Sequence, residues 1–166
     1  PEGCAAILWR DGGRKVADPV TRRLLLRPAA AFLPLFRGMV GGNRRPLTID
    51  RLEATPPGAN PGQDPGAALE AIFAGLRSDP VGSARQTLGY FQASGPEAPF
   101  TALARRYIMD RATGYHDYKL SEAVFESAAA LPSPWRQRYL AANVPYLNGP
   151  ADRPNARVAN ARALLR

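Results

Sequence analysis

The sequence predicts an all-α protein: a compact array of about six short helices, preceded by a long, mostly irregular N-terminal arm rich in Pro, Gly and Arg. Ala and Leu supply 47 of the 166 residues and Val and Ile only 11, a balance that favours helix because β-branched side chains suit strands. Beyond residue 66, apolar residues recur at spacings of three and four, which is typical of amphipathic helices. Before residue 66, frequent prolines leave little room for long helices.

The arm differs from the rest of the chain in its content of Pro and Gly. These two residues occupy 18 of the first 66 positions but only 14 of the last 100, and such enrichment is typical of irregular chain. Within the arm, residues 5–9 and 47–52 could each form a short strand, and residues 54–65 have the composition of a linker. We therefore expect an arm and linker over residues 1–66 and a helical domain over residues 67–166.

Prolines mark the expected helix starts, because a proline in the first turn costs no hydrogen bond. Asp64-Pro65, Asp79-Pro80, Ser94-Gly95-Pro96 and Ser133-Pro134 precede four of the helices. Two more are expected over residues 119–131 and 154–166, and Gly114 is expected to stop the third helix. The connections are short, which predicts that consecutive helices pack as antiparallel neighbours. The residues expected to be buried are Leu69, Ile72, Phe73, Leu76, Val81, Ala84, Leu88, Phe91, Phe100, Leu103, Tyr107, Ile108, Leu120, Val124, Ala128, Leu131, Trp135, Tyr139, Leu140, Val158, Ala161 and Leu165.

The chain is basic, with 22 Lys and Arg against 14 acidic residues and a formal net charge of +8. Twenty of the 22 are Arg, whose planar fork suits phosphate and carboxylate, although a GC-rich genome would also favour Arg over Lys. One Cys and one His exclude a disulfide framework and a zinc site built of Cys and His alone. Charged residues interrupt every apolar stretch near 20 residues, so no transmembrane helix is expected. Nothing in the sequence indicates a cellular compartment.

The stretch from residue 110 to 119 contains the densest set of reactive side chains. It places His116, Asp117 and Lys119 beside two tyrosines, Tyr115 and Tyr118, in an expected loop between helices. Loops on a rigid scaffold often supply acid–base groups, and an imidazole titrates near neutrality. The structural interpretation is favoured: the aspartate would cap a helix and the rings would cover a helix junction. No catalytic residue is therefore predicted, and these three remain the candidates.

A metal site is a second interpretation of the same region. Glu122 and Glu126 lie one helical turn apart, so with His116 and Asp117 they could form an oxygen-rich site. Ion pairs, with Lys119 for the first glutamate and a neighbouring arginine for the second, are the favoured alternative. Signatures of phosphate-binding loops are also missing from the sequence. We expect neither a metal nor a cofactor.

Residues 20–40 of the arm contain leucines and phenylalanines interspersed with arginines. Apolar side chains in an irregular arm would be exposed, so we expect them to pack on another surface. The predicted partner-binding residues are Arg22, Arg23, Arg27, Phe32, Phe36, Arg44 and Arg45. Membrane headgroups are another anionic surface that this segment could meet, but Pro28 and Pro34 interrupt a continuous amphipathic helix.

The leading functional hypothesis is a non-enzymatic helical accessory subunit, anchored in a larger assembly by the arm and bound to one or more protein partners. One alternative is an enzyme or small-ligand (cofactor) binder that uses the segment from Tyr115 to Lys119. Another is an RNA- or polyanion-binding protein that uses the arginine clusters. The leading hypothesis predicts that deletion of residues 1–60 leaves a folded domain without its partner.

Overall fold

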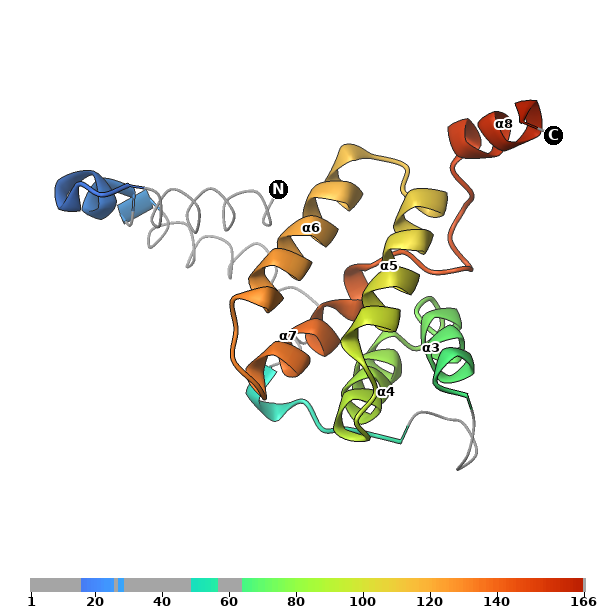
Figure 1. The fold of residues 1–166 in the computed structure, drawn as a ribbon, viewed down its shortest axis with the longest axis horizontal. Coiled ribbons are helices and arrows are strands. Elements are labelled where there is room, and N and C mark those ends of the chain that lie inside the picture. The colour runs from blue at the N-terminus through green and yellow to red at the C-terminus, as the bar shows by residue number, and fades with distance from the viewer. Residues whose placement is uncertain (1–15, 26, 29–48, 57–63, 166) are drawn as a thin grey trace. The chain divides into compact units, whose positions relative to one another are not determined.

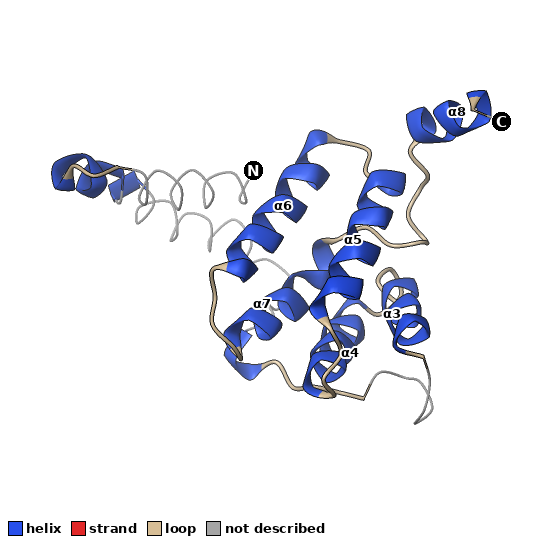
Figure 2. Cartoon of the chain, viewed as in Figure 1, coloured by secondary structure: helices blue, strands red, loops and turns tan. Residues whose placement is uncertain are grey.

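The computed structural model describes residues 16–25, 27–28, 49–56 and 64–165 (Figure 1). The chain divides into two compact units, Pro1–Pro46 and Leu47–Arg166. Within the described residues every regular element is a helix (Figure 2), so the predicted all-α class is confirmed. None of the helices in this part of the chain is both long enough and apolar enough to cross a bilayer.

The second unit contains the helical array, and its elements follow each other closely along the chain. In order they are η1 (Ile49–Arg51), α3 (Pro65–Ala74), α4 (Pro80–Gln92), α5 (Glu97–Arg111), α6 (Tyr115–Ala129), α7 (Trp135–Asn143), η2 (Val144–Tyr146) and α8 (Ala156–Leu164). Consecutive helices α3 and α4, α5 and α6, and α6 and α7 pack together as expected. The expectation is wrong for the other two pairs, because α4 packs on α7 and η2 and not along α5, and α8 packs on α5 and not on α7.

The predicted Asp-Pro starts of α3 and α4 are confirmed by their hydrogen bonds. Asp79 accepts a bond of 2.8 Å from the backbone N–H of Gly82, and Asp64 accepts one of 3.2 Å from Gly66. Each side chain thereby satisfies one of the backbone donors that a helix start leaves free. In both helices the proline stands at the first position, where its missing N–H does no harm.

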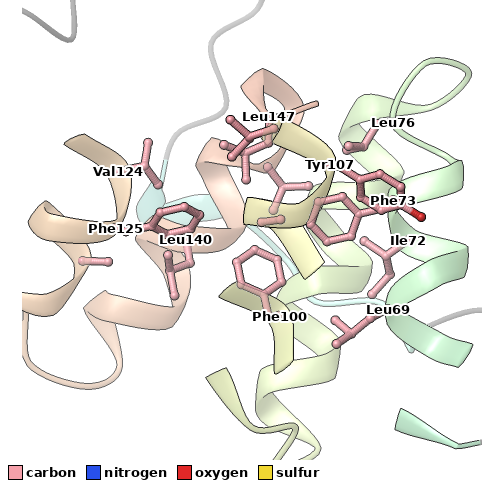
Figure 3. Close-up of a cluster of buried hydrophobic side chains, with 14 of the residues drawn as sticks. Leu69, Ile72, Phe73, Leu76, Phe100, Tyr107, Val124, Phe125, Leu140 and Leu147 are labelled. Carbon is pink, nitrogen blue, oxygen red and sulfur yellow. The ribbon is translucent and has the colours of Figure 1, made fainter. Parts of the chain in front are cut away.

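The main core lies where α3, α4, α5, α6 and α7 meet, and Figure 3 shows 14 of its side chains. Phe73 of α3 packs its ring 5.6 Å from Phe100 and 5.5 Å from Tyr107, both on α5. Phe91 of α4 makes an edge-on contact with Phe100 at 5.3 Å. The largest fully buried side chains belong to the predicted stripes, except Val144 and Thr87. Three large members of those stripes are exposed instead: Val81, Trp135 and Leu165 are 40%, 47% and 87% exposed.

A second, smaller core holds residues 49–56 against α4 and α7. Leu52 is only 4% exposed and packs with Ala84 and Leu88 of α4 and with Ala141 and Ala142 of α7. The backbone N–H of Thr55 donates to the carbonyl of Arg85 at 3.1 Å. We call residues 49–56 the strap; by its contacts it belongs to the helical unit, although it falls within the 1–66 arm expected from composition.

The strap does not adopt the strand expected near residues 47–52. Residues Ile49–Arg51 form a 3-10 turn instead. Arg138 of α7 explains this turn, because its Nη1 donates to the carbonyl oxygens of Ile49, Asp50 and Leu52 at 3.0, 3.3 and 3.1 Å. In an extended strand successive carbonyl groups point in opposite directions, so three carbonyls within four residues could not all reach one nitrogen.

In the first unit, residues 19–25 and 27–28 are helical, in a stretch where composition predicts mostly irregular chain. Asp18 begins this helix: its carboxylate accepts bonds from the backbone N–H and the hydroxyl of Thr21, at 2.8 and 2.5 Å. These bonds hold the pKa of Asp18 below its ordinary value, with the hydroxyl the larger cause. The strand expected at residues 5–9 lies outside the described residues.

Candidate functional site

The segment from Tyr115 to Lys119 is the first turn of α6 and not the expected loop, because α6 begins four residues earlier than its apolar stripe indicates. Asp117 stands at the third position of the helix, and its carboxylate accepts the backbone N–H groups of Thr113 and Gly114 at 2.9 and 3.3 Å. This is the return half of a capping box, in which an acidic residue inside the helix bonds backward to the cap. The favoured capping role of Asp117 thus has direct geometric support.

His116 and Lys119 are exposed and lie beside Tyr115. The imidazole ring is stacked 3.9 Å from the Tyr115 ring, and the Lys119 ammonium lies 5.0 Å from the centre of the same ring. A cation over an exposed aromatic ring contributes about 0.5–1 kcal/mol. The arrangement stabilises the start of α6, and its polar groups point to solvent. It does not bring the three candidate acid–base residues onto a common substrate position.

The carboxylates of α6 do not form the metal site that their spacing would allow. Glu122 lies 3.9 Å from Arg105 of α5, and both side chains are 58% exposed, so the pair is solvated and weak. The same guanidinium lies over the Phe125 ring. Among the described residues, His, Cys, Asp and Glu nowhere gather in a group that could hold a metal ion.

A polar cluster that the sequence did not reveal joins α3 to α5. The Tyr107 hydroxyl donates to Glu70, and Arg106 lies 2.5 Å from the other carboxylate oxygen. The tyrosine hydroxyl, and then the guanidinium, hold the pKa of Glu70 below its ordinary value, whereas burial raises the pKa of Tyr107. The Tyr107 ring is buried in the main core, so this cluster fixes one helix against another.

Most arginines of the helical unit bond to other groups of the same unit and so do not form a free basic surface. Arg136 donates to the carbonyls of Ala128, Ala129 and Leu131 at and just after the end of α6, where the Ala128 carbonyl also accepts the Leu131 N–H. Arg138 holds the strap, as described above. Other engaged arginines of this unit are Arg77 with Asp152, Arg105 with Glu122, Arg106 with Glu70, Arg111 with the Asp152 carbonyl and Arg162 with Asp110.

The predicted partner-binding residues that the structure describes are Arg22, Arg23 and Arg27, and all three are exposed on the helix of the first unit. On this helix Val20 and Leu24, one turn apart, are 63% and 55% exposed. Arg22 bonds back to the Val16 carbonyl at 2.9 Å. The predicted residues Phe32, Phe36, Arg44 and Arg45 lie outside the described residues.

Dividing the charge by segment shows where the basicity of the protein lies. Residues 19–46 contain six arginines and no acidic residue, and residues 153–166 contain four arginines and no acidic residue. Between them, residues 47–152 carry nine basic and eleven acidic residues. The helical core is therefore slightly acidic, and the two flanking segments account for the whole positive charge.

The described fold and site thus define an all-α protein with a self-contained helical core and two basic flanking segments. Comparisons with protein-family models, with curated proteins and with solved structures find no match to this chain.

Proposed function

We propose that this protein is a helical accessory subunit that docks on a protein partner in a larger assembly through the basic segment 19–46. The carrying observation is the helix of residues 19–25 and 27–28, where exposed Val20 and Leu24 stand among exposed arginines. Protein interfaces are enriched in arginine and depleted in lysine, and a helix with apolar residues one turn apart fits a groove. This surface suits an acidic, partly apolar protein face.

The helical unit uses most of its own apolar and arginine side chains internally, which supports this proposal. Its apolar stripes are buried against each other and its arginines are largely engaged within the unit. The acid-free segment 19–46 is left with a concentrated positive charge, which favours association with an anionic surface and accelerates encounter with it. Because residues 19–46 belong to the other compact unit of the chain, they can bind a partner without unfolding of the helical unit.

Truncation tests the proposal, and the strap fixes where to cut. Deletion of residues 1–60 would remove the buried Leu52, so the informative variant begins at Leu47. The full chain and this variant are expressed with the same tag in the source organism, and their assemblies are compared by size-exclusion chromatography and mass spectrometry. We expect the variant to keep its helical circular dichroism and to elute free of the proteins that accompany the full chain.

A charge-matched pair of variants separates docking from general electrostatics. Arg23→Glu with Arg27→Glu changes the segment, and Arg51→Glu with Arg85→Glu makes the same charge change at exposed sites of the helical unit. The first pair should release the partner and the second should not. Equal effects of the two pairs, or an unchanged assembly after truncation, would refute the proposal. Association lost after ribonuclease treatment would show the RNA-binding alternative instead.

A further inference from the structure

Helix α8 is held in a fixed position although none of its residues is buried. Its cap residue, Asn155, donates its backbone N–H to the Asp110 carbonyl at 2.9 Å and its side-chain amide to the Ala112 carbonyl at 2.7 Å. Arg162 adds an ion pair of 2.6 Å with the Asp110 carboxylate. Polar contacts to the end of α5 therefore position α8, and burial of its own apolar side chains does not.

The connection that leads to α8 is also fixed, by Asp152. One carboxylate oxygen accepts the Gly149 backbone N–H at 2.8 Å, and the other lies 2.8 Å from Arg77 of α3. The Asp152 carbonyl accepts a bond of 3.2 Å from Arg111 of α5. A helix presented from such a connection loses less conformational freedom on binding than a free tail would.

The apolar stripe expected to bury the last helix is not buried: Val158 is half-buried, and Ala161 and Leu165 are exposed. Leu164 and Leu165 are each 87% exposed, the highest exposure of any large apolar side chain in the described residues. Residues 158, 161 and 165 share one face by their spacing, with Arg157 and Arg162 on its two sides, and Leu164 lies beyond Arg157, outside that face. Figure 1 shows α8 at the C-terminal end, beyond the helices that form the main core.

The charge of this region identifies the chemistry of its partner. Residues 153–166 hold four arginines and no carboxylate side chain. Arg162 is engaged with Asp110, while Arg153 and Arg157 are exposed with no partner among the described residues. Exposed apolar residues close to two uncompensated arginines, Arg153 before the helix and Arg157 in its first turn, complement an apolar floor bordered by acidic residues.

We infer that α8 is a second docking element, which enters an acidic groove with an apolar floor on a protein partner. RNA suits this helix poorly, because it offers no aromatic ring for stacking and would set two leucines against phosphates. A membrane surface suits it poorly as well, because nine residues provide only a short apolar face to insert. The inference rests on α8 alone and is independent of the role of residues 19–46.

A defined acidic probe tests this inference with the full chain. The probe is a synthetic 18-residue helical peptide with Leu on one face, Glu on the other and one photoreactive leucine, labelled for fluorescence anisotropy. Two variants alter α8, Arg153→Glu with Arg157→Glu and Leu164→Ala with Leu165→Ala. The matched control is Arg51→Glu with Arg85→Glu. None of these side chains is buried, and circular dichroism verifies that each variant is folded.

We expect photo-crosslinks from the probe to residues 153–165 and a Kd raised about tenfold or more by each α8 variant, with the control changing it less than about twofold. Crosslinks confined to residues 19–46, no measurable binding, or a Kd unaffected by either α8 variant would overturn the inference. Polyuridylic acid or vesicles of phosphatidylcholine and phosphatidylserine serve as competitors. The inference would be overturned in favour of a polyanion-binding surface if either competitor bound in a way that required Arg153 and Arg157 but not Leu164 and Leu165.

Discussion

Gly89→Ala tests whether the strap is part of the folded core. Gly89 lies inside α4, where alanine would ordinarily stabilise a helix by about 1 kcal/mol. A Cβ at this position would lie 2.0 Å from the Thr55 carbonyl oxygen, which is backbone and cannot rotate away. Because ordinary contact begins near 3.4 Å, the strap would have to move by about 1.4 Å.

The expected cost follows from what that movement disrupts. The bond from Thr55 to the Arg85 carbonyl is worth about 1 kcal/mol, and full exposure of Leu52 costs about 1.5–3 kcal/mol. After subtraction of the helix-propensity gain, the free energy of unfolding should fall by about 1.5–3 kcal/mol. The sign of the substitution is thus set by a contact with a segment more than 30 residues away in sequence.

Urea denaturation measures this change, and limited trypsin digestion reports on the strap itself. Displacement of the strap should accelerate cleavage after Arg51, because the following residue, Leu52, would leave its buried site. Gly114→Ala is the control: an added Cβ there meets nothing within 4 Å and φ is −140°. That variant should change stability by less than about 0.5–1 kcal/mol. Stability of Gly89→Ala equal to or above that of the parent protein would refute the docked strap.

Two further predictions concern single side chains. Asp117→Ala should lower the free energy of unfolding by about 1 kcal/mol by removing the backward cap of α6, as measured by urea denaturation; an unchanged midpoint would contradict this role. Because the folded-state pKa of Glu70 is lowered, its stabilisation is present above its ordinary pKa and is lost as the pH falls through the lowered value. Glu70→Gln should therefore be less stable than the parent protein at pH 7 and equal to it in acid, and a difference that persists at pH 2–3 would contradict the ionic origin of the effect.

At the start of α6, the capping role predicted for Asp117 is supported, but its position relative to the helix was predicted wrongly. Sequence reasoning assigned Asp117 to a cap, which the structure supports, but placed it before the helix and not in its first turn. A carboxylate just before a helix bonds forward to the N–H groups of its first turn, and a carboxylate in the first turn bonds backward to the cap N–H, so an acidic residue is favoured at both positions. Spacing alone does not distinguish the two geometries, so the Tyr115–Lys119 segment was expected to be a loop.

The amino-acid sequence alone determined the helical class, the proline-marked helix starts and most of the residues of the main core. Each of these depends on residues within one or two turns of each other, where φ restriction, capping and apolar spacing act directly. Only the tertiary structure decided that Arg138 holds the strap 86–89 residues away and that Tyr107 reaches Glu70 across 37. It also decided that α8 is fixed by polar contacts with its leucines exposed. Such contacts depend on how completed helices pack against one another, and no spacing along the chain encodes that packing.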